Sequence, residues 1–63
     1  MNAIETKRHE IIYRVANSGG CVAIFKEIDG TYTVEQSDLY RVYWSTPGFK
    51  TYKAAKREYQ CCH

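Results

Sequence analysis

The chain has 63 residues, a net charge of +2 and 25% charged side chains. This length allows one domain, residues 1–63, and so short a chain buries only about 60% of the surface that its unfolded form exposes, which argues against a deep catalytic pocket. No apolar run approaches the roughly 20 residues that span a bilayer, and the polar first ten residues do not resemble a secretory signal. We therefore expect a small folded protein without enzymatic activity and without membrane association.

The cysteines indicate a reducing compartment. Three cysteines, at positions 21, 61 and 62, are an odd number without a signal peptide, which predicts the cytoplasm rather than a disulfide framework. Cys61, Cys62 and His63 are adjacent, whereas zinc ligands are normally separated by two to four residues. His9 and His63 lie at opposite ends of the chain, and no Ser-His-Asp set or glycine-rich phosphate loop is present. The sequence predicts neither a metal site nor a cofactor.

The N-terminal third allows two secondary structures. In residues 10–16, Ile11, Tyr13 and Val15 alternate with other side chains as in a strand, but several isoleucines and Val15 also lie close to one helical stripe. The β-branched and aromatic composition favours the strand, which residues 17–20 would connect to the next one. Residues 1–8 are expected to be flexible.

The strongest hairpin signal is Asp29-Gly30 between residues 21–27 and 31–36. A two-residue loop would set Ile24 opposite Glu35. A three-residue loop, with Gly30 in the left-handed conformation, sets Ile24 opposite Val34 and adds Val22 and Tyr32 to the same face. Because a slip of one residue exchanges the two faces, the apolar match favours the three-residue loop. The opposite face then carries Ala23, Phe25, Glu27, Thr31, Thr33 and Glu35.

The remaining residues predict a third strand and a helix. Alternation over residues 40–45 places Tyr40, Val42 and Trp44 on one face, and Thr46-Pro47-Gly48 is typical of a type II turn. Thr51 is a suitable N-cap for a helix over residues 52–60, in which one stripe holds Tyr52, Ala55, Tyr59 and Cys62. We predict an α+β fold, with a three- or four-stranded antiparallel sheet and one C-terminal helix packed on one face. The predicted core is Val22, Ile24, Val34, Val42, Trp44 and Ala55.

The charge is distributed unevenly. Residues 17–39 carry four acidic side chains and one basic, whereas residues 40–63 carry five basic side chains and one acidic. A focused basic face attracts phosphates, although lysines and arginines on a helix can also be simply its solvated side. The candidates for nucleic-acid binding are Lys26, Arg41, Lys50, Lys53, Lys56 and Arg57.

The sheet face away from the helix is a second candidate surface. Phe25, Tyr43 and Arg41 are expected there, and exposed aromatic and arginine side chains are typical of protein-binding surfaces. They could also stack on bases, but Glu27 and Glu35 on the same face count against nucleic acid. A third interpretation is that the two aromatic rings pack on each other or on the N-terminal segment. Phe25, Arg41 and Tyr43 are the candidates for protein interaction.

Three runs of residues, 30–34, 40–44 and 49–55, together resemble the arm-type DNA-binding domains of phage integrases. The resemblance implies that Lys26, Arg41 and Tyr43 would read a DNA groove and that Lys50 and Lys53 would contact phosphates. The first hairpin of that family is strongly basic, whereas here it is acidic. A free-standing chain of this kind also resembles small accessory proteins of phage early regions, many of which bind a host protein. We therefore predict a module in the host cytoplasm that binds a protein or self-associates, with DNA or RNA binding as the alternative.

Overall fold

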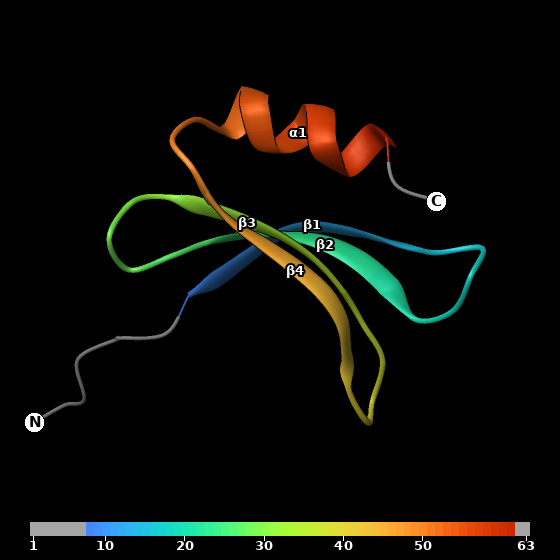
Figure 1. Ribbon diagram of the computed structural model, residues 1–63. Helices are drawn as coiled ribbons and strands as arrows, with labels where there is room; N and C mark the ends of the chain where they lie inside the picture. Colours follow the sequence, from blue (N-terminus) through green and yellow to red (C-terminus); the bar gives the residue numbers. More distant parts are fainter. Residues whose placement is uncertain (1–7, 62–63) are drawn as a thin grey trace, which may run out of the picture.

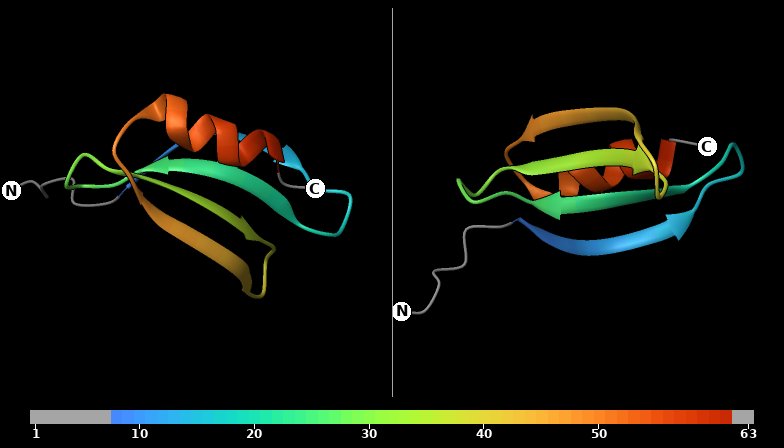
Figure 2. Two further views of the ribbon diagram at one scale, coloured as in Figure 1. Left: turned by 45° about the horizontal axis from the view of Figure 1, so that its top comes forward. Right: turned by 90° about the horizontal axis from the view of Figure 1, so that it is seen from below.

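A computed structural model describes residues 8–61, which form an antiparallel sheet and one helix (Figure 1). The elements are β1 (His9–Val15), β2 (Cys21–Lys26), β3 (Tyr32–Ser37), β4 (Val42–Phe49) and α1 (Tyr52–Cys61). The sheet has four strands in the order β1-β2-β3-β4, so each strand pairs with its neighbour in the sequence. Helix α1 lies across one face of the sheet and leaves the other face without a helix, as both views of Figure 2 show. The predicted α+β class is confirmed.

The ambiguous N-terminal segment is a strand. Ile12 pairs with Ile24 and Arg14 with Val22, so both lie on the helix side, whereas Tyr13 pairs with Ala23 on the helix-free side. The register shifts between Glu10 and Ile12, which is a bulge at Ile11. The Arg14 guanidinium donates a hydrogen bond of 2.8 Å to the Tyr59 carbonyl and thereby ties β1 to the last turn of α1.

The β2–β3 hairpin has the predicted three-residue loop. The Glu27 amide donates to the Thr31 carbonyl (2.8 Å), and the Gly30 amide donates to the Glu27 carbonyl (3.0 Å). Gly30 has φ +92°, the left-handed conformation that this loop requires. Ile24 therefore pairs with Val34 and Phe25 pairs with Thr33. This confirms both the register and the separation of the two faces.

The core lies between α1 and the sheet, mainly over β2 and β3. Ile24, Val22 and Val34 are fully buried, and the half-buried aromatic side chains of Tyr32 and Trp44 pack around them. The other buried apolar residues on this side are Ala16, Ala55 and Tyr59. A polar group continues the layer, because the Trp44 indole donates to Gln36 Oε1 (2.7 Å). Trp44 was expected to be buried, but it is only half-buried, on the edge strand β4.

Strand β4 differs from the prediction at both ends. It begins at Val42 rather than Tyr40, and Tyr40 and Val42 are 90% and 54% exposed, so their assignment to one core-facing strand stripe was wrong. The cause is a bulge: Gln36 pairs with Trp44 but Ser37 pairs with Val42, so Tyr43 is an extra residue. Because this extra residue reverses the alternation, Val42 lies on the face of Ser37 and not on the helix side.

The predicted turn at Thr46-Pro47-Gly48 is also wrong, because β4 continues through it to Phe49. Val34 pairs with Thr46 and Tyr32 with Phe49, which leaves Pro47 and Gly48 as a second bulge. Pro47 is tolerated since it lies in a bulge of an edge strand, where proline occurs in sheets. Gly48 nevertheless has a positive φ, +91°, the conformation that a type II turn would also require of it.

Helix α1 begins as predicted. Thr51 Oγ1 accepts a hydrogen bond from the Ala54 amide (3.1 Å), which caps the first turn. Ala55 and Tyr59 are buried against the sheet, and the half-buried Tyr52 ring makes an edge-on contact with Tyr32 at 6.0 Å between centroids. Cys62, the last member of the predicted stripe, lies outside the described residues. In the described part of the chain, no helix is long and apolar enough to cross a membrane.

Two glycines allow a matched test of the fold. A methyl group on Gly20 (φ +65°) would overlap the Ser37 carbonyl oxygen, whereas one on Gly30 (φ +92°) would meet no atom within 4 Å. Gly30→Ala should lower the free energy of unfolding by only the conformational cost of about 1–2 kcal/mol. Gly20→Ala should lower it by at least about 3 kcal/mol, because the β3 backbone must also move. Equal losses in urea denaturation would contradict the close packing of residues 17–20 on β3.

Candidate interaction surfaces

The β3–β4 connection presents two apolar side chains to solvent. The Asp38 amide donates to the Arg41 carbonyl (2.9 Å), which leaves Leu39 and Tyr40 at the apex of the turn. Leu39 is 93% exposed and Tyr40 is 90% exposed. In Figure 1 this turn projects from the end of the sheet, away from α1. We call residues 38–43 the β3–β4 tip.

The Asp38 carboxylate holds the backbone of the tip. Its Oδ1 accepts hydrogen bonds from the amides of Tyr40 (2.7 Å) and Arg41 (2.9 Å). Its Oδ2 accepts a hydrogen bond of 2.8 Å from the Tyr43 hydroxyl. The Arg41 guanidinium lies 4.8 Å from the centroid of the Tyr43 ring, a cation–π distance. One carboxylate thus fixes the turn that exposes Leu39 and Tyr40.

The tip is also held by the neighbouring β1–β2 loop. A methyl group on Gly19 would lie 3.1 Å from the Tyr43 hydroxyl, so the ring passes close to the backbone of this glycine. The Gln36 amide group donates to the Gly19 carbonyl (2.6 Å) and to Ser18 Oγ (3.0 Å). The loop is therefore bound to β3 and supports Tyr43 from the side.

The hydrogen bonds shift two acidities at the tip. Donation from the Tyr40 amide, then from the Tyr43 hydroxyl and the Arg41 amide, lowers the pKa of the Asp38 carboxyl below its usual value. The same contact with Asp38 raises the pKa of the Tyr43 hydroxyl. At neutral pH the Asp38 carboxylate is charged and accepts all three hydrogen bonds.

The predicted protein-interaction residues do not form one cluster. Arg41 and Tyr43 lie together at the tip, but Phe25 pairs with Thr33 near the other end of the sheet. Sequence reasoning missed Leu39 and the exposure of Tyr40. The available signal was an apolar pair directly after Ser37-Asp38, at positions where turns usually carry glycine, asparagine or another small polar residue.

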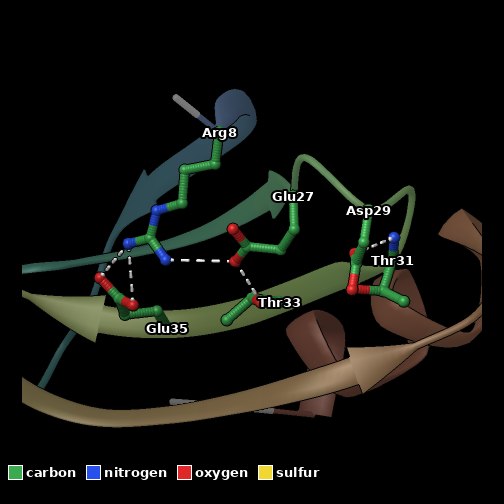
Figure 3. A network of polar contacts seen from close by, with 6 residues as sticks. All are labelled: Arg8, Glu27, Asp29, Thr31, Thr33 and Glu35. Carbon is green, nitrogen blue, oxygen red and sulfur yellow. Dashed lines mark hydrogen bonds and ion pairs between the residues drawn. The ribbon is translucent and has the colours of Figure 1, made fainter. Parts of the chain in front are cut away.

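A second feature occupies the helix-free face of the sheet. Arg8 Nη2 donates to both carboxylate oxygens of Glu35 (3.0 and 2.9 Å), and Nη1 donates to Glu27 (3.3 Å), as Figure 3 shows. The guanidinium carbon lies 3.9 Å above the centroid of the Phe25 ring. Burial alone would lower the pKa of Arg8, but the hydrogen bonds and charge of Glu35 and Glu27 outweigh it and raise that pKa. Within the segment expected to be flexible, only Arg8 is described, and its side chain makes these contacts.

A hollow of about 490 Å³ lies beside this cluster. Its walls combine acidic, hydroxyl and apolar groups from the β2–β3 loop and from the second bulge of β4, namely Glu27, Ile28, Asp29, Thr31, Thr33, Pro47 and Gly48. Glu27 and Thr33 belong both to the hollow and to the polar cluster, since Thr33 Oγ1 donates to Glu27 Oε2 (Figure 3). We call these seven residues the acidic hollow.

The basic side chains gather mainly on α1. Lys53 and Arg57 are exposed, and with Lys56 they border a depression of about 310 Å³. Lys50 is exposed immediately before the helix. Of the other nucleic-acid candidates, Lys26 ends β2 with its ammonium 5.9 Å from the Tyr32 ring, and Arg41 belongs to the tip. Three of the six candidates therefore lie on one helix surface, and Lys50 directly precedes it.

Among residues 8–61, no group of three or more histidine, cysteine or acidic side chains is arranged to hold a metal ion. Cys21 is half-buried and Cys61 is exposed, and both are free thiols. Comparison with protein-family models, with curated proteins and with solved structures finds no match to this chain. The assignment of function therefore depends on the surfaces described above.

The lowered pKa of Asp38 predicts how the tip responds to acid. A carboxylate whose pKa is lower in the folded state stabilises that state above its unfolded value of about 3.9, and the stabilisation disappears as the pH falls through the folded pKa. The amide NMR signals of Tyr40 and Arg41 should thus shift with a midpoint below that of a free aspartate. Asp38→Asn should abolish this transition but retain the corresponding one at Thr31, whose partner Asp29 also has a lowered pKa. A Tyr40 midpoint at or above the ordinary value would contradict the proposed role of the carboxylate.

Proposed function

We propose that this chain is a non-enzymatic interaction module that binds a protein partner through the β3–β4 tip. The observation that supports this most strongly is the exposure of Leu39 and Tyr40 on a turn that a carboxylate fixes. Solvent-exposed turns normally carry polar residues, so a leucine and a tyrosine at an apex have no evident role in the stability of the isolated domain. Both side chains suit insertion into an apolar pocket of a partner.

The tip has the properties of a binding element that is ordered in advance. A protein that fixes a loop before binding avoids part of the entropy loss on association. Tyrosine and arginine are enriched among residues that dominate binding energies, and Tyr40 and Arg41 are adjacent here. The Asp38 hydrogen bonds would therefore contribute to affinity without touching the partner.

Strand addition at the sheet edges is a less favourable mode. An unpaired edge is a template for another strand, but bulges and proline are devices that weaken it. The edge strand β1 has a bulge at Ile11, and the edge strand β4 has two bulges and Pro47. These features favour side-chain insertion from the tip over pairing of the sheet with a second copy.

Photo-cross-linking tests the tip directly. A photoreactive phenylalanine in place of Tyr40 should yield one dominant cross-linked protein in expressing cells. The same residue in place of Ile28, which is 70% exposed in a different turn, should not yield it. With that protein purified, Leu39→Ser/Tyr40→Ser should weaken binding by about 30-fold or more, the value for loss of a dominant contact. Ile28→Ser should leave the affinity unchanged.

Two outcomes would overturn this proposal. A cross-link from position 40 to a second copy of the chain, with a matching dimer in sedimentation, would indicate self-association instead. Equal cross-linking from positions 40 and 28 would show that the tip has no special role.

The basic surface of α1 supports a second candidate function, the binding of nucleic acid. Lys53, Lys56 and Arg57 border one depression, with Lys50 just before the helix, and the resemblance to arm-type domains implies phosphate contacts at Lys50 and Lys53. These side chains point away from the core, so their charge can be removed without loss of packing. The acidic residues of the first hairpin make this candidate secondary.

Salt dependence decides whether the basic surface functions. Each phosphate contact contributes about 0.9 to the slope of log K against log salt on duplex DNA. Lys50→Gln/Lys53→Gln/Arg57→Gln should then reduce that slope by roughly 2 to 3, while thermal unfolding stays unchanged. A slope that is the same in the variant and the wild type would exclude α1 as the phosphate-binding surface.

A further inference from the structure

The helix-free face contains the elements of a receptor for a guanidinium group. Glu35 lies in the middle of β3 with its side chain only 8% exposed, and both of its oxygens accept from one guanidinium nitrogen. Glu27 accepts a hydrogen bond from a second nitrogen of Arg8. The guanidinium carbon lies over the Phe25 ring, 3.9 Å from its centroid. Two carboxylates and an aromatic ring match the charge, the donors and the planar shape of arginine.

The present ligand of these groups comes from outside the sheet. Arg8 precedes β1, and its contacts with Glu27 and Glu35 join residues 19 and 27 positions apart in the sequence. Its side chain keeps 35% exposure, so it covers the site from the solvent side. Phe25 lies in β2, Glu27 follows β2 directly and Glu35 lies in β3. Backbone pairing of the hairpin, and not Arg8, sets the positions of these three residues.

The surroundings leave room for a longer ligand. The acidic hollow adjoins the site, because Glu27 and Thr33 belong to both. It adds the exposed carboxylate of Asp29 and the apolar surfaces of Ile28 and Pro47. Two carboxylates, those of Glu27 and Glu35, thus face a single bound cation, Arg8 (Figure 3). Asp29 adds a third negative charge in the hollow, where its carboxylate accepts from Thr31. The excess negative charge favours a basic peptide over any acidic one.

We propose that Phe25, Glu27 and Glu35 form a binding site for an arginine side chain of a peptide partner, and that Arg8 occupies this site until the partner displaces it. The site is separate from the β3–β4 tip and does not depend on the function proposed for it. Binding would exchange one guanidinium for another, so the buried Glu35 keeps a charged partner in both states. The peptide backbone on either side of the arginine would lie along the acidic hollow.

Competition between the two arginines determines the expected affinities. A residue attached to the same chain acts at an effective concentration in the millimolar range, so the wild type should bind an external arginine weakly. Bound Arg8 lowers the apparent affinity of the site for an external arginine. Removal of the Arg8 side chain should therefore raise this affinity by about 10-fold or more. Lysine should bind worse than arginine, because it lacks the planar fork and stacks less well on a ring.

The experiment uses the full chain and capped Gly-Arg-Gly and Gly-Lys-Gly tripeptides, observed through the NMR signals of the Phe25 ring. Arg8→Ala should bind the arginine peptide at least about 10-fold more tightly than the wild type and the lysine peptide more weakly. Glu35→Gln in the Arg8→Ala background should remove this binding. Glu58→Gln in the same background is the matched control on the opposite side of the molecule and should change nothing.

A second variant covers the case in which Arg8→Ala does not fold because Glu35 loses its partner. Arg8→Lys retains a positive charge but cannot form the same pair of hydrogen bonds, so it should fold and still bind the arginine peptide more tightly than the wild type. The proposal is overturned if neither variant binds the arginine peptide more tightly than the wild type does, or if arginine and lysine peptides bind equally. Either result would make the Arg8 cluster a structural ion pair only.

Discussion

The register of the β2–β3 hairpin is the constraint on which the rest of this structure depends. In an antiparallel pair, a shift of one residue moves every side chain to the other face. The three-residue loop places Ile24 opposite Val34 and thus gives the single helix an apolar surface to cover. The same choice places Phe25 opposite Thr33 on the other face, beside Glu35. Both the core and the polar cluster therefore follow from one turn.

One helix on a four-stranded sheet leaves a whole face without secondary structure above it. Part of this face is covered by a charged side chain, because the Arg8 guanidinium lies over Phe25 and pairs with Glu35. A buried ion pair is weak evidence for stability, because the cost of removing both charges from water offsets most of their attraction. A site whose buried Glu35 has a charged partner only while an arginine occupies it is better suited to recognition of that group.

Much of the fold could be predicted from local patterns, and the exceptions have identifiable causes. The loop at Gly30 and the cap at Thr51 depend on neighbouring residues, so the sequence was sufficient for them. Alternation failed in β4, because the bulge at Tyr43 exchanges the faces and no residue there marks it. The site of Arg8 could not be predicted, since its partners Glu27 and Glu35 lie 19 and 27 positions away in the sequence. The tip was only partly predicted: Arg41 and Tyr43 were candidates, but strand alternation placed Tyr40 in a strand, on the same face as Val42 and Trp44.

The most direct test of the account is an NMR measurement of the β2–β3 register. The hydrogen bond from the Glu27 amide to Thr31 makes Ile24 and Val34 a pair without mutual backbone hydrogen bonds, in which the two Cα atoms approach most closely. A strong nuclear Overhauser effect between the α-protons of Ile24 and Val34 is the predicted result. The same effect between Phe25 and Val34 would show the two-residue loop, in which these two residues form the pair without mutual backbone hydrogen bonds. That register would move Phe25 and Glu35 away from the positions on which the fold and the arginine site both depend.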